Sequence, residues 1–241
     1  MTMTDTPRTF PWRTLLFFLR DVVVIFAIAI VVSFVVKTFL VRSFYIPSSS
    51  MEQTLEINDR IIVSELVPKL VSLEHGDVVV FRDPGGWVMA TTEPDMNPVQ
   101  AGIEWTLSLF GLVAPDSDEH LVKRVIGLPG DTVACCTTDG KVTVNGVPLT
   151  EPYINLPEGQ IRASAIDFEK YVEPGTIFVM GDNRYNSADS RANLAKPGGG
   201  FVPVDNVVGR AVVVSWPAEH WAWLDNYPDV FQGISSLEGG E

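Results

Sequence analysis

The chain has 241 residues, of which 46% are hydrophobic, and its formal net charge is −13. This length and hydrophobic content exclude a disordered chain and fit one folded unit with a sizeable core. Residues 1–42 hold five basic and two acidic residues, so 12 basic and 28 acidic residues lie beyond them, a net charge of −16. A domain this acidic repels phosphate groups, which argues against a nucleic-acid-binding function.

The first predicted element is an apolar helix. Residues 22–41 (VVVIFAIAIVVSFVVKTFLV) contain one charged residue, Lys37, near the end of the stretch, where its side chain can reach lipid headgroups. At 1.5 Å per residue the stretch spans about 30 Å, the thickness of a bilayer core. We therefore expect a tail over residues 1–20, a single transmembrane helix over 21–42 and an extracytoplasmic domain over 43–231.

The charges around this helix predict its orientation. Three basic residues precede it and favour a cytoplasmic N-terminus: Arg8, Arg13 and Arg20. The alternative is a cleavable secretory signal, because small residues follow at Ser48 to Ser50. The apolar stretch is long for such a signal, and the bulky residues 44–46 separate it from the serines. We therefore favour a helix that is retained.

Beyond the helix, short runs of β-branched residues alternate with turns, which predicts a mostly β, antiparallel domain. The predicted strands are residues 60–63, 77–81, 121–126, 132–136, 141–144, 176–180 and 207–215. Two hairpin signals, Asp139-Gly140 and Asn145-Gly146, predict a small β meander at residues 132–150, inside a subregion that extends to residue 180.

Two parts of the chain are interpreted as additions to this domain. Residues 82–120 form an insertion, and residues 232–241 are predicted to be a disordered tail. The insertion contains the apolar segment 101–113, which is too short to cross a bilayer, so a helix packed on the domain is favoured over a membrane-surface contact. Core packing is likewise favoured over a membrane-interface position for three tryptophans, Trp216, Trp221 and Trp223.

The two cysteines are adjacent, at Cys135 and Cys136. No CxxC spacing or histidine cluster accompanies them, so no metal site is expected. They form either a vicinal disulfide in an oxidising compartment or two free thiols on opposite faces of a strand. We favour the free thiols.

Two segments carry side chains suited to nucleophilic catalysis. Residues 44–55 (FYIPSSSMEQTL) place three serines beside Pro47, a pattern that alone indicates a turn. In residues 121–133 (LVKRVIGLPGDTV), Lys123 shares one strand face with apolar neighbours. A lysine of ordinary pKa, about 10.4, is neutral about one part in a thousand near pH 7.4, so a role as base requires burial that lowers its pKa by about three units. The alternative is an edge lysine that reaches solvent.

A third segment, residues 180–191 (MGDNRYNSADSR), follows a predicted strand and is rich in residues that hold loops by hydrogen bonds and ion pairs. Four segments in order, PSSSMEQTL, GDVVVF, KRVIGLPGD and GDNRYNSADSR, resemble the motif set of bacterial type I signal peptidases. With the preceding helix they cover most of residues 22–215. The insertion and the tail fall outside the resemblance.

This resemblance implies a Ser/Lys dyad peptidase on a β-rich fold of signal-peptidase type, with no metal and no cofactor. It assigns Ser50 as the nucleophile and Lys123 as the general base. The Ser48 hydroxyl and the Ser50 N–H would form the oxyanion hole. Ser187 would hydrogen-bond Lys123 and orient it.

The resemblance also implies supporting and substrate-binding residues. Ion pairs would stabilise the loop at residues 180–191. They would involve Asp182, Asp189, Arg191 and Arg124. Apolar pockets for small substrate side chains would be lined by Phe44, Ile46, Met51, Leu55 and Val122. The motifs depart from the family at two positions: Tyr185 replaces the usual aspartate, and Ser49 replaces the glycine of many relatives.

The implied function is a membrane-bound serine endopeptidase that removes N-terminal signal peptides from exported preproteins after Ala-x-Ala sites. Its partners would be these preproteins and membrane lipid, with the secretion translocon nearby and no nucleic acid. The protein would lie in the cytoplasmic membrane as a single-pass protein, where substrates tethered by their own apolar helices are concentrated.

Three other functions compete with this interpretation. A Ser/His peptidase would need His75, His120 or His220, each of which is interpreted as a surface residue. A sortase-like transpeptidase would need a lone reactive cysteine, which an adjacent pair does not supply. A membrane-tethered β module that binds proteins or cell-surface material would leave Ser50 and Lys123 as ordinary loop and strand residues.

Overall fold

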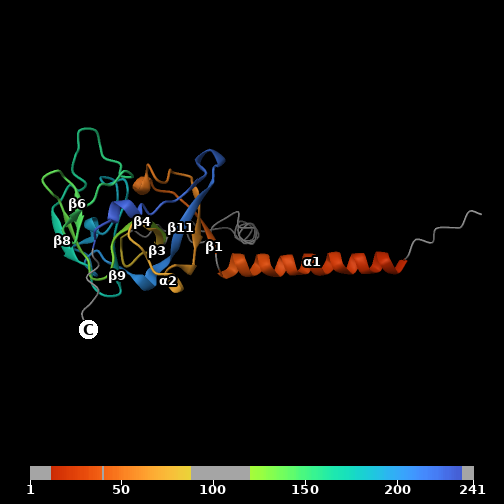
Figure 1. The fold of residues 1–241 in the computed structure, drawn as a ribbon. Coiled ribbons are helices and arrows are strands. Elements are labelled where there is room, and N and C mark those ends of the chain that lie inside the picture. The colour runs from red at the N-terminus through yellow and green to blue at the C-terminus, as the bar shows by residue number, and fades with distance from the viewer. Residues whose placement is uncertain (1–11, 40, 88–119, 235–241) are drawn as a thin grey trace, which may run out of the picture. The chain divides into compact units, whose positions relative to one another are not determined.

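The computed structural model describes residues 12–39, 41–87 and 120–234 (Figure 1). The chain divides into two compact units, Met1–Leu40 and Val41–Glu241. The predictions for residues 1–11, for the apolar segment 101–113 and for residues 235–241 lie outside the described residues. Two predicted bounds are wrong: residues 12–20, predicted as a tail, are helical, and Ile234, predicted to lie in a disordered tail, packs against a core cluster.

The first unit contains one helix, α1 (Trp12–Phe39), of 28 residues. Its apolar side chains between Leu16 and Val32 are exposed. Within the described ranges, no helix is both long enough and apolar enough to cross a membrane. The predicted transmembrane helix is therefore not confirmed, although the apolar stretch on which it was based continues through Leu40, which is not described.

The second unit is built on an antiparallel sheet whose strand order is β1-β2-β11-β3-β4-β9-β10, with β12 added beside β11. These strands are β1 (Val41–Tyr45), β2 (Arg60–Ser64), β3 (Val78–Arg82), β4 (His120–Gly127), β9 (Thr176–Met180), β10 (Val202–Pro203), β11 (Val207–Trp216) and β12 (Ala222–Trp223). Every strand pair in it is antiparallel. The predicted mostly β, antiparallel fold is confirmed.

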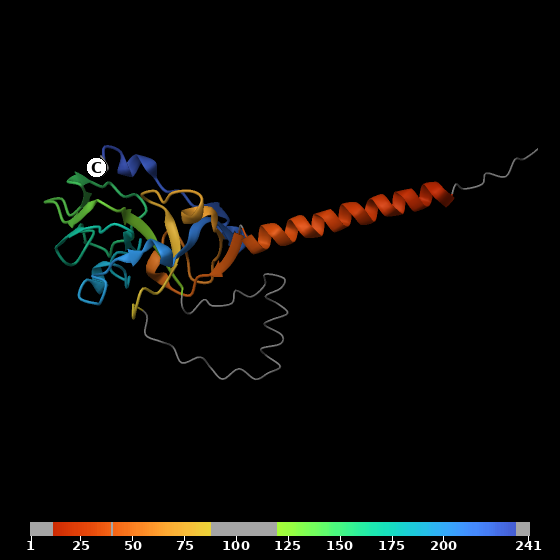
Figure 2. The same cartoon turned by 90° about the horizontal axis from the view of Figure 1, so that it is seen from below.

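A second, four-stranded antiparallel sheet has the order β7-β6-β5-β8. Its strands are β5 (Thr132–Cys135), β6 (Val142–Val144), β7 (Val147–Pro148) and β8 (Phe168–Tyr171). The turn between β6 and β7 has positive φ at Asn145 (52°) and Gly146 (80°), as the hairpin signal predicted. Figures 1 and 2 show β6 and β8 at one end of this unit and β1 at the other.

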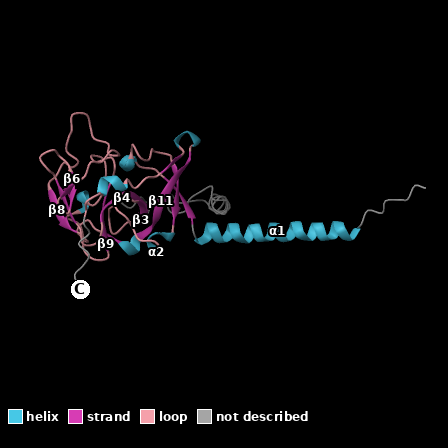
Figure 3. Cartoon of the chain, in the orientation of Figure 1, coloured by secondary structure: helices cyan, strands magenta, loops and turns pink. Residues whose placement is uncertain are grey.

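Short helices lie between the strands, which dominate the unit (Figure 3). They are the α-helix α2 (Leu66–Lys69) and the 3₁₀ helices η1 (Ser49–Met51), η3 (Arg191–Asn193), η4 (Val204–Asn206), η5 (Ala218–His220) and η6 (Pro228–Phe231).

The core explains why the strand at residues 78–81 is an unbroken apolar run. Val78 and Val80 pack in one buried cluster, whereas Val79 and Phe81 pack in another. Because successive side chains of a strand point to opposite faces, both faces of the large sheet are covered here. A third cluster contains residues of both sheets, including Val133 of β5 and Phe178 of β9, and it joins them.

Two predictions about this unit are wrong. Trp216, Trp221 and Trp223 are exposed and do not pack in the core, because β12 is a two-residue strand that pairs with β11 alone. Cys135 and Cys136 are joined by a disulfide. The free-thiol interpretation assumed a strand through residue 136, but β5 ends at Cys135, so the alternation of faces does not extend to Cys136.

Candidate active site

The candidate nucleophile lies in a short helical turn. Ser50 is inside η1, directly after the strand β1 and Pro47, and its side chain is buried. Ser48 is the N-cap of this turn, and its Oγ accepts a hydrogen bond from the Ser50 N–H at 3.2 Å. The N-cap bond fixes the backbone at Ser50, as N-cap serines do at the start of helices.

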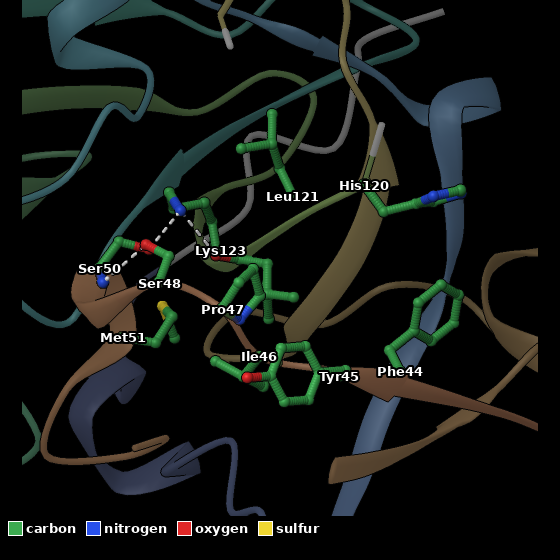
Figure 4. Close-up of a pocket in the computed structure, with 11 residues that line it drawn as sticks. Phe44, Tyr45, Ile46, Pro47, Ser48, Ser50, Met51, His120, Leu121 and Lys123 are labelled. Carbon is green, nitrogen blue, oxygen red and sulfur yellow. Dashed lines mark hydrogen bonds between the residues drawn. The ribbon is translucent and has the colours of Figure 1, made fainter. Parts of the chain in front are cut away.

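Lys123 extends from β4 to this turn. Its side chain is 3% exposed, and its Nζ lies 2.7 Å from Ser50 Oγ and 2.8 Å from the Val122 carbonyl oxygen (Figure 4). Strand alternation places Lys123 and its neighbour Arg124 on opposite faces of β4. The edge-lysine alternative, in which the amine reaches solvent, is wrong for this structure.

Burial alters the chemistry of this amine. Desolvation lowers the pKa of Lys123 from 10.5 to about 8, against the opposing negative charges of Asp189 and Asp182. About a fifth of the molecules then hold a neutral Lys123 at pH 7.4, compared with about one in a thousand for an ordinary lysine. A neutral amine can accept the Ser50 hydroxyl proton while its own N–H donates to the Val122 carbonyl.

The neighbouring Arg124 makes the predicted ion pair with Asp182. Both side chains are fully buried, and Arg124 donates from Nε to Asp182 Oδ1 at 2.9 Å and from Nη2 to Oδ2 at 2.8 Å. The guanidinium also donates to the Gly76 and Asp225 carbonyls. It lies 3.9 Å from the centre of the Tyr153 ring, a cation–π contact.

The second predicted ion pair joins Asp189 to Arg191. Arg191 Nη2 lies 2.6 Å from Asp189 Oδ2, and both side chains are nearly or fully buried. Asp189 Oδ2 also accepts the Gly181 N–H at 3.0 Å. The loop at residues 181–191 is thus closed on itself by charge-assisted hydrogen bonds at both of its ends.

Sequence reasoning missed a third buried pair in this loop. Arg184 makes a bidentate contact with Glu151, at 2.7 and 2.6 Å, and both side chains are almost completely buried. Tyr153 donates its hydroxyl to Glu151 as well. The position of Arg184 in the polar loop could have suggested an ion pair, but nothing in the sequence identifies Glu151 as its partner.

Sequence reasoning also missed two asparagines that hold the nucleophile turn. The Asn183 side chain donates to the Ser49 carbonyl at 3.2 Å and to Glu52 Oε2 at 3.0 Å, and its N–H donates to the Ser50 carbonyl at 3.1 Å. Asn186 donates to Ser49 Oγ at 2.8 Å. These bonds fix the turn of Ser50 against the 181–191 loop.

One predicted contact is absent. Ser187 does not hydrogen-bond Lys123. Its Oγ is buried and has no hydrogen-bond partner among the described residues. Lys123 Nζ instead contacts Ser50 Oγ and the Val122 carbonyl. The Ser187 hydroxyl lies against Gly181, where a Cβ would be 2.2 Å from it.

A small cavity of about 60 Å³ opens beside Ser50 and Lys123. Its other lining residues are Phe44, Tyr45, Ile46, Pro47, Ser48, Met51, His120, Leu121 and Val122 (Figure 4). Four of the five predicted pocket residues line it. Leu55 does not, because it is fully buried in the core cluster that also contains Met51. Tyr45, Pro47, His120 and Leu121 were not predicted to line it.

The family model described as signal peptidase, peptidase S26, matches residues 19–216 of the chain. The chain belongs to this signal peptidase family. It is therefore a serine endopeptidase of the signal peptidase I type.

Two individual signal peptidases agree with the family model in sequence. The chain is 40% identical to signal peptidase I of Mycobacterium tuberculosis over 236 residues, which covers 90% of this chain and 78% of that protein. It is 31% identical to a probable signal peptidase I of Synechocystis, over 93% of this chain and 94% of that protein. A crystal structure of signal peptidase I from Enterococcus faecalis matches with 25% identity and a TM-score of 0.36, over 58% of this chain and 96% of that one.

The two departures from the signal peptidase motifs have different structural settings. Tyr185 is partly exposed, and its hydroxyl contacts Gln160 Oε1 at 3.3 Å, so it joins a surface contact. Ser49 supplies the hydroxyl that Asn186 binds. In the part of the chain that the structure describes, no group of three or more His, Cys, Asp or Glu residues is arranged to hold a metal ion.

Proposed function

We propose that this signal peptidase removes signal peptides from exported preproteins with Ser50 as nucleophile and Lys123 as general base. The observation that carries the proposal is the 2.7 Å contact between the Lys123 amine and the Ser50 hydroxyl, in a setting that lowers the amine pKa to about 8. An activated nucleophile needs a base within hydrogen-bond reach whose pKa is close to the working pH.

The reaction proceeds in two halves. Neutral Lys123 takes the proton of Ser50 Oγ as this oxygen attacks the scissile carbonyl, and the resulting ammonium gives the proton to the leaving amine. An acyl-enzyme on Ser50 remains. Lys123, neutral again, then takes a proton from water, which attacks the ester, and returns the proton to Ser50 Oγ as the signal peptide leaves.

The developing oxyanion is stabilised by the Ser50 N–H and the Ser48 hydroxyl. Support comes from their proximity, because the Ser50 N–H already donates to Ser48 Oγ at 3.2 Å. When the oxyanion forms, the Ser48 hydroxyl rotates to donate to it, and the Ser50 N–H donates to it in place of Ser48 Oγ. One such preorganised donor contributes about 2.7–4 kcal/mol to the rate in other serine peptidases.

Small substrate side chains suit the cavity beside the dyad. Its volume is about 60 Å³, and Ile46, Met51 and Val122 form apolar walls that exclude bulk by steric overlap. Residues His120–Lys123 of β4 pair with β3 on one edge, and in the described ranges β9 joins the other edge only from Arg124 onward. An extended substrate can add to that edge, which supports cleavage after Ala-x-Ala.

We also infer attachment to the cytoplasmic membrane. The exposed apolar side chains of α1 support contact with lipid, and the apolar stretch of the sequence, residues 22–41, runs past the end of α1. Basic residues ahead of it support a single pass with a cytoplasmic N-terminus. The catalytic unit then works on the far side, near the translocon, where preproteins tethered by their signal peptides are concentrated.

Cleavage of a defined precursor tests this proposal. Detergent-solubilised wild type is incubated with a precursor that ends its signal peptide in Ala-x-Ala, and the products are measured by mass spectrometry. Wild type and a matched exposed-serine control, Ser72→Ala, should cut after the second alanine. Ser50→Ala should not cut, and retained cleavage by this variant would contradict the assignment.

A further inference from the structure

A hydrogen bond between two side chains joins the nucleophile turn to the 181–191 loop. Ser49 is the first residue of η1, between the N-cap Ser48 and the nucleophile Ser50. Asn186 is an exposed residue of the loop, and its Nδ2 donates to Ser49 Oγ at 2.8 Å. The bond thus acts next to the backbone N–H of Ser50, although 137 positions of the sequence separate its two residues.

Other bonds hold the same turn at different groups. Within the turn, the Ser50 N–H donates to Ser48 Oγ at 3.2 Å. From the loop, Asn183 donates its side-chain amide to the Ser49 carbonyl and its N–H to the Ser50 carbonyl. The two Asn183 bonds therefore hold carbonyl groups of the turn, whereas the Asn186 bond holds a side chain beside the N-cap.

The proposed mechanism replaces one of these bonds during the reaction. When the oxyanion forms, the Ser50 N–H donates to it in place of Ser48 Oγ, so the turn loses its N-cap bond. A preorganised donor stabilises an oxyanion only from the correct position, so the turn must keep its place after this loss. The bond from Asn186 to Ser49 Oγ can remain throughout, because neither group is exchanged in the reaction.

We propose that Asn186 and Ser49 are positioning residues that keep the Ser50 N–H directed at the oxyanion after the N-cap bond is lost. The inference rests on the proposed function of Ser50 and Ser48. Before the attack, the turn is held by the N-cap bond and by the Asn186 bond together. Afterwards the Asn186 bond acts without the N-cap bond, so its removal should raise the energy of the transition state more than that of the bound substrate.

Three variants test this role as full-length enzymes in detergent: Asn186→Ala, Ser49→Ala and the double variant. On a peptide with an Ala-x-Ala site, we expect kcat to fall about two- to tenfold in each single variant, the range of one neutral hydrogen bond. The KM should change less than twofold. The double variant should lose no more than either single variant, because both substitutions remove the same bond.

A second measurement separates positioning from a lower fraction of folded enzyme. A peptide boronic acid forms an anionic tetrahedral adduct with a serine hydroxyl and so mimics the intermediate on Ser50. Its Kd, measured by isothermal titration calorimetry, does not depend on the fraction of enzyme that is active. We expect the Kd to rise in Asn186→Ala by a factor similar to the fall in kcat.

Thr150→Val is the matched control. Its hydroxyl also accepts an exposed side-chain hydrogen bond, from Lys141 Nζ at 2.9 Å, but it follows β7 of the four-stranded sheet. The control should keep the kcat, the KM and the boronic acid Kd of wild type. Equal losses in the control and in Asn186→Ala would overturn the proposal.

Three further results would also overturn it. They are a wild-type kcat or boronic acid Kd in Asn186→Ala, losses that multiply in the double variant, and a KM that rises by as much as kcat falls. Asn186 is exposed, so its replacement gives the test even if Ser49→Ala does not fold. Failure of the proposed function has a different signature: Ser50→Ala cuts the peptide, or Ser48→Ala keeps the kcat of wild type.

Discussion

Lys123 and Arg124 are consecutive in β4, but their side chains serve different partners: the amine lies 2.7 Å from Ser50 Oγ, whereas the guanidinium binds Asp182. One strand thus delivers the proposed base to one face of the sheet and the principal ion pair of the 181–191 loop to the other. The position of the base and the position of the loop are fixed by the same short piece of backbone.

The pH dependence of cleavage should follow the neutral form of Lys123. Its pKa is lowered from 10.5 to about 8, so kcat/KM should rise with pH and reach half of its maximum near pH 8. Rates on a fixed peptide between pH 6 and 9.5 measure this midpoint. Lys170→Gln should share the profile of wild type, and a midpoint near 10 in wild type would show an ordinary lysine.

Lys123→Met should abolish cleavage and raise the melting temperature at neutral pH. The folded lysine has a pKa of about 8, against 10.5 in the unfolded chain, so the unfolded chain binds more protons between these values and stability rises with pH across them. Below pH 8 the buried amine costs about 3 kcal/mol, and above 10.5 this cost is absent.

Thermal unfolding at pH 7 and near pH 10.5 therefore distinguishes this effect from general repacking. The increase in melting temperature caused by Lys123→Met should be present at pH 7 and largely lost at the higher pH. Lys170→Met provides the comparison, since that side chain is only partly buried. A lower melting temperature at pH 7 together with intact cleavage would refute both the burial argument and the assigned role.

Asp182→Asn should destabilise the enzyme strongly. The substitution removes the charge that faces fully buried Arg124, and breaking one side of a buried pair costs about 3–5 kcal/mol. Denaturant unfolding measures the loss. Asp167→Asn breaks the exposed pair with Arg162 and should cost less than about 1 kcal/mol, so similar losses in the two variants would be inconsistent with this account.

Ser187→Ala should not lower the melting temperature. The buried Ser187 hydroxyl has no hydrogen-bond partner among the described residues, so its removal deletes an unsatisfied polar group. Because Ser187 makes no contact with Lys123 Nζ here, the pH midpoint of cleavage should also stay near that of wild type. A shifted midpoint would mean that the two side chains meet in solution.

Gly181→Ala should reduce cleavage sharply. A Cβ at this position would lie 2.5 Å from the Ser50 carbonyl oxygen and 2.2 Å from Ser187 Oγ. Substitution of Ser187 removes the contact with its hydroxyl, whereas no substitution removes the contact with the Ser50 carbonyl oxygen. The double variant Gly181→Ala/Ser187→Ala should therefore remain impaired in kcat/KM, and full recovery in it would assign the effect to Ser187 alone.

Seven strands of the fold were predictable because their signals are local, whereas β1, β8, β10 and β12 were not predicted. The run TIFVM gave the bounds of β9, Thr176–Met180, without error, and the Asn145-Gly146 turn appeared where its dihedral preferences place it. The contact between Ser50 and Lys123 was predictable because the motifs lie at recognisable positions in order. Both kinds of signal are contained in short pieces of sequence.

Apart from the disulfide between adjacent Cys135 and Cys136, the errors and omissions concern contacts between distant segments. Glu151 and Arg184 pair although 33 positions separate them, and no pattern in either segment encodes that pairing. The Ser187 contact failed because hydrogen bonds depend on small differences in backbone position. Trp216 ends β11 and Trp223 lies in β12, but whether their side chains are covered depends on what packs beside β12.

The hydrogen bond between the Ser50 N–H and Ser48 Oγ affects how strongly the resting enzyme binds a substrate carbonyl. A neutral substrate carbonyl would have to compete with Ser48 Oγ for this N–H, which already has an acceptor. Exchanging one neutral acceptor for another would gain little binding free energy. In the proposed mechanism the anionic oxygen of the tetrahedral intermediate is a far stronger acceptor, so it takes the N–H bond from Ser48 Oγ and also accepts a hydrogen bond from the Ser48 hydroxyl. If the Ser50 N–H stabilises the oxyanion as proposed, its bond to Ser48 Oγ weakens binding of the substrate carbonyl in the ground state but not in the transition state. The N–H should then affect kcat more than KM.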